Sequence, residues 1–195
     1  RLRCDWSSDV CSSDLNWEDR STCVLFGDGA GAAVLRRAED GDGEILATEI
    51  GTDGSQTHLL NIPGGGSACP ITTENADKRL ATLAMIGPEV FKHAVTRMRD
   101  CANLVIARSG LKAEDIKLVI PHQANLRIID AIAKRLTVPK DRVFVNLHKY
   151  GNTSAAACAI ALDEAHRSGR FGKGDHIVLV AFGAGLTWAA AAVRW

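Results

Sequence analysis

The chain has no long hydrophobic run, no excess of either charge and no regular cysteine pattern, and each absence excludes a class of protein. None of its apolar stretches approaches the roughly 18 residues that a membrane-spanning helix needs. Lys plus Arg and Asp plus Glu both number 23, so no overall field favours nucleic acid or an anionic membrane as partner. Six cysteines at irregular spacing argue against a zinc ribbon or a disulfide scaffold. No secretory leader is evident, which predicts a cytoplasmic protein.

The first fifteen residues differ in character from the rest of the chain. Asp-Trp-Ser-Ser-Asp-Val at 5–10 is nearly repeated by Cys-Ser-Ser-Asp-Leu at 11–15, with no helical or strand period. Such a polar repeat resembles a translated sequencing adapter more than a protein element. We therefore predict a non-native leader at 1–15 and one domain at 16–195. The alternative is a natural disordered terminus.

The remaining residues alternate between strand-like and helix-like patterns, as expected of an α/β protein. Apolar residues at steps of three and four predict helices at 88–110, 124–136 and 155–165. Short apolar runs predict strands at 22–26, 32–37, 44–50, 116–120, 143–147, 175–182 and 186–194, and 51–75 is rich in loop residues. The helix at 155–165 is small and apolar almost all round, which predicts that it is buried within a larger body, since this chain alone offers few elements to cover it.

Two polar loops each follow a predicted apolar strand. Pro-His-Gln-Ala-Asn occupies 121–125, and Gly-Asn-Thr-Ser-Ala-Ala occupies 151–156. Because ligands of open α/β sheets bind outside the carboxyl ends of the strands, His122 and Asn152 are candidates for one shared site. The plainer alternatives are a loop histidine bound to backbone and an asparagine that caps the next helix. The second loop can both cap the next helix and contribute to the site if Thr153 or Ser154 is the cap and Asn152 faces the site.

Four segments, in this order, resemble the second half of a 3-oxoacyl-acyl carrier protein synthase III, a condensing enzyme of the thiolase superfamily. They are Phe-Gly-Asp-Gly-Ala-Gly-Ala-Ala-Val-Leu at 26–35, the stretches 121–129 and 151–156, and Phe-Gly-Ala-Gly-Leu-Thr-Trp at 182–188. The resemblance implies an α/β fold, namely the C-terminal half of a thiolase-like αβαβα sandwich with a mixed five-stranded sheet and helices on both faces. The family's nucleophilic Cys belongs to the first half. We therefore expect it outside this chain, and the chain alone to be inactive.

The resemblance also implies a reaction. In this family the Cys accepts an acyl group from acyl-coenzyme A, usually acetyl, and malonyl-acyl carrier protein then loses carbon dioxide and attacks it. This decarboxylative Claisen condensation starts fatty-acid synthesis, in a homodimer without metal or bound redox cofactor. His122 and Asn152 match the catalytic pair, two neutral donors suited to an enolate oxyanion. Gly183, Ala184 and Gly185 match the loop whose backbone N–H serves the oxyanion of acyl transfer.

Two further groups of residues match the family's substrate-contact positions. The substrate tunnel or acyl pocket is matched by Met85, Gly87, Phe91, Asn125 and Phe182. The basic patch that docks the acidic carrier protein is matched by Arg127 and Lys92, with Lys134 and Arg135 on the same helix as Arg127. Ordinary helix packing and a solvated charged face are the respective alternatives. Ala189 replaces the Gly that many relatives carry after Thr-Trp, which predicts a narrower acyl pocket.

Other functional interpretations of these motifs stay open. Another condensing enzyme of the superfamily, making polyketides or quinolone precursors, would carry similar motifs, and so would a non-catalytic partner subunit. A metal site at His122 and His148 is less favoured, because no carboxylate or Cys stands at a familiar ligand spacing.

The glycines and cysteines have structural interpretations. Gly27, Gly29 and Gly31 lack the spacing of a dinucleotide-binding loop, and we interpret them as a tight turn. None of the cysteines at 23, 101 and 158 lies at the strand-to-helix elbow that exposes a family nucleophile, so none is assigned that role.

Overall fold

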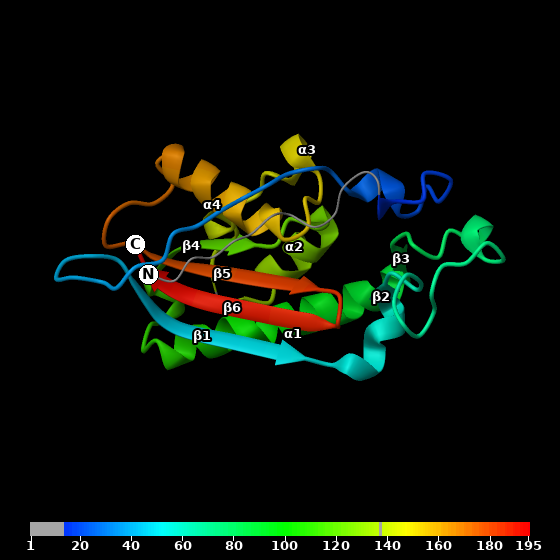
Figure 1. Cartoon of the computed structure of the whole chain (residues 1–195). Coiled ribbons are helices and arrows are strands. Elements are labelled where there is room, and N and C mark those ends of the chain that lie inside the picture. The colour runs from blue at the N-terminus through cyan, green and yellow to red at the C-terminus, as the bar shows by residue number, and fades with distance from the viewer. Residues whose placement is uncertain (1–13, 137) are drawn as a thin grey trace.

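A mixed sheet forms the centre of the fold in the computed structural model, which describes residues 14–136 and 138–195 (Figure 1). Its four strands lie in the order β1 (Glu44–Thr52), β6 (Thr187–Arg194), β5 (His176–Gly183) and β4 (Ile116–Pro121). β4 and β5 run parallel, whereas the other neighbours run antiparallel. A separate short ladder joins β2 (Leu60–Asn61) to β3 (Ala84–Met85).

Helices cover both faces of this sheet (Figure 1). α1 (Gly87–Arg108) lies across β1, β5 and β6, and α2 (Leu126–Ala133) packs beside it. α4 (Ala156–Arg167) covers β4 and β5 from the other side, after the single turn α3 (Leu147–Tyr150). The predicted α/β fold with a mixed sheet and helices on both faces is confirmed.

The central strands are apolar on both sides because each side has helices to bury it. Along β5, Val178 and Val180 belong to the core under α1, whereas Ile177 belongs to the core under α4. This is the two-residue alternation of an extended strand. The apolar runs correctly predicted β1, β4, β5 and β6, and the helical periodicity correctly predicted α1, α2 and α4. The observed bounds of each element lie within a few residues of the predicted ones.

Two of the predicted strands near the start of the domain are wrong. The run at 22–26 forms a 3-10 turn at Cys23–Leu25, and only Phe26 makes a single parallel bridge, to Asn152. The run at 32–37 contains only an isolated bridge position, at Leu35. Val24 and Val34 are exposed, and among the described residues neither run belongs to a sheet.

The predicted strand at 143–147 is also reduced to a single bridge, between Val143 and Val119. The backbone N–H groups of Asn146 and Leu147 donate to the side-chain oxygen of Gln123, at 3.0 and 3.2 Å, and not to a neighbouring strand. The side chain of Gln123 therefore accepts hydrogen bonds from two N–H groups that a further strand of the sheet would have used for pairing. Among the described residues the main sheet has four strands, where five were predicted.

The glycine-rich segment at 26–31 is extended and passes over α4, so the predicted tight turn is wrong (Figure 1). None of its glycines has a positive φ. Glycine is required here because the segment passes very close to its neighbours. A Cβ at Gly29 would lie only 2.9 Å from Cδ1 of Ile160. A Cβ at Gly27 would overlap the carbonyl oxygen of Tyr150, and one at Gly31 would overlap the side chain of Ala159.

α4 is only partly covered by the described part of the chain. Ala157 and Ala161 are buried against the sheet, but Ala155 is exposed and Cys158 and Leu162 are only partly buried. In the described part of the chain, cover comes from the sheet on one side and from the glycine-rich segment on another. This partial cover agrees with the expectation that this chain alone offers few elements to bury the helix.

The predicted leader at 1–15 falls mostly on residues 1–13, which lie outside the described residues. Of the remaining two, Leu15 is buried, and the carbonyl oxygen of Asp14 accepts a hydrogen bond from the backbone N–H of Leu83 at 2.9 Å.

Candidate active site

His122 is placed at the carboxyl end of β4, beside the parallel strand β5. Its backbone N–H donates to the carbonyl of Val180 at 2.7 Å, which extends the pairing of the two strands by one residue. The imidazole is partly buried, and its ring nitrogens make no hydrogen bond to the described part of the chain. It is therefore free to donate to a ligand.

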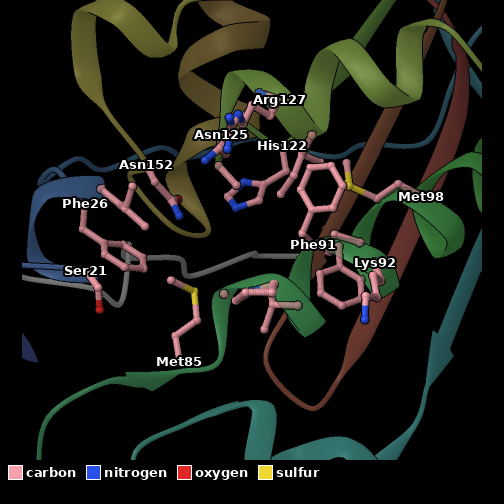
Figure 2. A pocket seen from close by; sticks show the side chains of 18 residues that line it. Ser21, Phe26, Met85, Phe91, Lys92, Met98, His122, Asn125, Arg127 and Asn152 are labelled. Atoms are coloured by element: carbon pink, nitrogen blue, oxygen red, sulfur yellow. Dashed lines mark hydrogen bonds between the residues drawn. The ribbon is translucent and has the colours of Figure 1, made fainter.

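Asn152 is held in place by the glycine-rich segment. Its backbone N–H donates to Leu25 at 3.0 Å, and its carbonyl accepts from Gly27 at 2.9 Å. A segment more than a hundred residues away in sequence thus fixes the second candidate residue. Figure 2 shows His122 and Asn152 pointing toward the same space, and both residues line one cavity.

The amide of Asn152 has a defined orientation. Its Oδ1 accepts from the backbone N–H of Ser154 at 3.0 Å, a donor that can pair only with the oxygen. Nδ2 is therefore left to face the pocket as a donor. α4 begins at Ala156 with Ala155 as its N-cap and no side-chain cap, so the prediction that Thr153 or Ser154 caps the helix is wrong.

A cavity of about 810 Å³ lies in front of both residues (Figure 2). All five residues predicted for the tunnel line it, and so do Lys92 and Arg127 from the predicted docking patch. The remaining wall is mostly apolar and includes Pro88, Val90, Ala94, Met98 and Ile128. A pocket of this kind, mostly apolar with a few polar groups, is typical of a small-molecule site.

Among the lining residues that sequence reasoning missed, three come from the start of the domain: Ser21, Leu25 and Phe26. They reach the pocket through the bridge between Phe26 and Asn152. No local pattern could have placed them there, because that pairing joins segments distant in sequence.

The turn between β5 and β6 borders a second, smaller hollow of about 400 Å³. Gly183 and Ala189 line this hollow together with His122, whereas Ala184 and Gly185 line neither cavity. The turn is held from outside, since Thr57 Oγ1 donates to the carbonyl of Gly185 at 3.0 Å. His122 thus stands between the main cavity and the hollow beside the predicted oxyanion loop.

The basic residues divide between two places. Lys92 and Arg127 lie at the main cavity, and Lys92 pairs with Glu89 at 2.7 Å. Lys134 and Arg135 line a separate shallow hollow of about 360 Å³ that Arg127 also borders. Arg127 therefore connects the cavity to a basic surface on α2.

Burial lowers the pKa of His122 to about 4, so the imidazole is neutral at pH 7. The same cause raises the pKa of the Cys158 thiol, in the second hollow, to about 12. The pKa of Cys101 is about 11, raised by burial and by the carboxylate of Glu49. Both thiols are protonated at neutral pH, and this agrees with the decision to assign neither as a nucleophile.

We expect the free energy of unfolding to rise with pH between about pH 4 and 6.5. His122 titrates near pH 4 in the folded chain and near 6.5 when unfolded, so the unfolded chain binds more protons in this window. The gain across the window is about 2 to 3 kcal/mol. Urea unfolding at several pH values measures it, and His122→Gln is the control, because that variant should lose the slope. A curve for the variant that runs parallel to the wild type would contradict the assignment.

Two other features bear on the alternatives. No helix in the described part of the chain is long and apolar enough to cross a membrane. Across residues 14–136 and 138–195, no group of three or more His, Cys, Asp or Glu side chains could hold a metal ion.

Comparison with known proteins agrees with this geometry. The family model "3-Oxoacyl-[acyl-carrier-protein (ACP)] synthase III C terminal" matches residues 106–195, and "3-Oxoacyl-[acyl-carrier-protein (ACP)] synthase III" matches residues 6–54. The second match begins inside the predicted leader, whose boundary stays a prediction.

Relatives and solved structures extend the match over almost the whole chain. The beta-ketoacyl-[acyl-carrier-protein] synthase III of Caldanaerobacter subterraneus is 54% identical over 188 residues, 96% of this chain and 56% of the relative. The synthase III structure from Aquifex aeolicus has a TM-score of 0.83 at 47% identity, over 94% of this chain and 55% of that one. The priming beta-ketosynthase of the R1128 polyketide pathway has a TM-score of 0.74 at 33% identity, over 93% and 53%.

The chain thus spans little more than half the length of the relatives it matches. Because both models of one family match in their expected order and the identity to a synthase III reaches 54%, the chain belongs to the 3-oxoacyl-[acyl-carrier-protein] synthase III family and has its thiolase-like fold.

Proposed function

We propose that this chain supplies the His and Asn donors of a condensing site that joins an acyl group from acyl-coenzyme A, acetyl in particular, to malonyl-acyl carrier protein. The observation that carries the proposal is the pair of neutral donors, His122 and Asn152, at the wall of one mostly apolar cavity. The family membership supports the same reaction.

The chemistry requires stabilisation of an enolate. When the malonyl thioester loses carbon dioxide, the electron pair of the broken C–C bond moves onto the thioester, and its oxygen becomes negative. The imidazole N–H of His122 and the amide of Asn152 would donate to this oxygen, a preorganised arrangement that is effective in a site with little water. Because His122 is neutral at pH 7, it stabilises the oxyanion without readily transferring a proton to it.

The second step forms the new C–C bond. The enolate carbon attacks the carbonyl carbon of an acyl group held as a cysteine thioester, the C–S bond breaks, and the cysteine leaves as a thiolate. Neither buried thiol near the sheet is suited to that role, as their raised pKa values indicate. We therefore propose that the nucleophilic Cys comes from the part of the family fold that precedes this sequence, and that the chain alone is inactive.

The surroundings of the donors support a carrier-protein substrate. The cavity wall, with Met85 and Phe91, suits the long arm of a pantetheine thioester, and Lys92 and Arg127 add positive charge there. Lys134 and Arg135 continue that charge in the turn that follows α2, outside the cavity. A basic surface of this kind attracts an acidic protein and steers its approach. The family resemblance further supports a cytoplasmic homodimer without metal or bound redox cofactor.

A second candidate is a condensing enzyme that primes polyketide synthesis. It is favoured by the similarity to the R1128 priming ketosynthase, which has the same fold at 33% identity. Ala189, in the hollow beside the β5–β6 turn, is a position where acyl-chain preference could differ between the two.

The test is a chimera in which residues 16–195 replace the part of the Caldanaerobacter synthase that aligns with them, so that all of that synthase before the aligned part is kept. We expect this chimera to form 3-oxoacyl-acyl carrier protein from acetyl-coenzyme A and malonyl-acyl carrier protein, measured by mass spectrometry of the carrier protein. The parent synthase is the control. A folded chimera that uses only coenzyme A thioesters would favour the second candidate. A folded chimera without any turnover would favour a non-catalytic partner subunit.

A further inference from the structure

A buried glutamine joins the two loops that carry His122 and Asn152. The side chain of Gln123 is next to His122 in sequence and only 1% exposed. Its Nε2 donates to the carbonyl oxygens of Pro121, at 2.7 Å, and Phe144, at 3.2 Å. Its Oε1 accepts from two backbone N–H groups beyond Phe144 in sequence, so both ends of the amide are used.

On the His122 side, this amide fixes the end of β4. One donor of Gln123 returns to the carbonyl of Pro121, the residue before His122. The backbone N–H of His122 itself pairs with Val180 on β5. The imidazole therefore projects from a backbone that is tied to its own strand, to the next strand and to the second loop.

On the Asn152 side, the amide fixes both elements that flank the loop. Oε1 of Gln123 accepts from the backbone N–H of Leu147, whose carbonyl accepts from Gly151 at 2.8 Å, and Asn152 follows directly. Oε1 also accepts from Asn146, whose Nδ2 donates to Glu164 of α4 at 3.0 Å. The turn before Asn152 and the helix after it are thus connected to one side chain.

We propose that Gln123 is a positioning residue that sets the placement of Asn152 relative to His122. It lines none of the cavities described above, so it acts through its neighbours and not on the substrate. The inference deepens the proposed function, since it names the side chain that holds the two proposed donors in register.

A primary amide is suited to this position because it offers two donors and two acceptor lone pairs in one plane. Methionine has a similar length but supplies neither, so Gln123→Met would leave two carbonyls and two N–H groups unpaired in a buried place. A carboxylate would accept from the N–H groups but would face the carbonyls of Pro121 and Phe144 without a donor. A protonated carboxyl would restore one of those donors.

The first test is amide hydrogen exchange in the 195-residue chain, together with the titration of His122 followed by NMR. In Gln123→Met we expect the amides of Asn146 and Leu147 to exchange on the order of tenfold faster. We also expect the pKa of His122 to move up from about 4 toward 6.5, because the loosened loops admit water. Neither measurement depends on catalysis. A negative result therefore counts against the positioning role of Gln123 and not against the proposed reaction.

The control is Ile106→Ala, which removes buried core volume near the C-terminal end of α1 and none of the hydrogen bonds of Gln123. It should lower stability without selective loss of protection at Asn146 and Leu147 and without moving the pKa of His122. A folded Gln123→Met with both readouts unchanged would overturn the proposal. If Gln123→Met does not fold, the proposal is tested with the variant Gln123→Glu. Its protection factors at the two amides should recover as the pH falls and the carboxyl takes up a proton, and no recovery would overturn the proposal.

Discussion

Replacement of His122 by alanine should lower the condensation rate of the chimera by about 10² to 10³-fold, or about 3 to 4 kcal/mol of transition-state stabilisation. The imidazole stands at the cavity wall without a protein partner for its ring nitrogens in the described part of the chain, and burial keeps it neutral. Its removal takes away one donor to the developing oxyanion. The loss should fall on kcat, since the interaction strengthens as the enolate forms. Steady-state kinetics with malonyl-acyl carrier protein measures it.

His148→Ala is the matched control for this variant. His148 lies on α3, is exposed and lines none of the cavities described above, so its replacement should leave the rate within about twofold. A similar loss for both histidines would refute the assignment and would revive the metal site that the sequence left open.

Asn152→Ala extends the same measurement to the second donor. If His122 and Asn152 act on one oxygen, the double variant should lose less than the product of the two single losses, because residues that act as a unit are not additive. Strictly multiplicative losses would indicate that the two side chains serve different steps.

Gly27→Ala should lower the free energy of unfolding by about 3 kcal/mol, a large effect for one methyl group. The added Cβ would overlap the backbone carbonyl of Tyr150, which cannot rotate away as a flexible side chain could. Relief requires the glycine-rich segment to separate from the loop at 151–152. The hydrogen bond from Gly27 to the carbonyl of Asn152 would then be lost, so the site should be damaged together with the fold.

Urea unfolding of the full chain tests this expectation, with Gly172→Ala as the control. A Cβ at Gly172 meets nothing within 4 Å and the residue has no positive φ, so the stability should change by less than about 1 kcal/mol. Equal stability changes in the two variants would show that the segment moves aside without cost, and would contradict the close approach at Gly27.

Much of the architecture was predictable because it depends on local patterns. Apolar residues at helical spacing determine α1, and Gly110, with a φ of 71°, ends it as expected. The apolar runs of β4 and β5 place His122 at the carboxyl end of the sheet, where a ligand site was expected. The sequence therefore determined the longer helices and the four strands of the main sheet.

The segments that the sequence misassigned depend on partners far away in the chain. The run at 143–147 has strand composition, yet its donors go to Gln123, a partner that no periodicity reveals. The glycines at 27, 29 and 31 suggested a turn, whereas the structure uses them for close passage over α4. In both cases the local sequence permits two conformations, and a long-range contact selects one.

The same distinction applies to the site. The sequence by itself determined the family, and it predicted His122, Asn152 and five further residues that line the cavity. Only the tertiary structure decided that Phe26 completes the wall, that Lys134 and Arg135 lie outside it, and that the oxygen of Asn152 is occupied so that its nitrogen faces the ligand. The physical reason is that residue type and spacing fix local conformation, whereas the direction of a side chain depends on hydrogen bonds and packing that form only when distant segments meet.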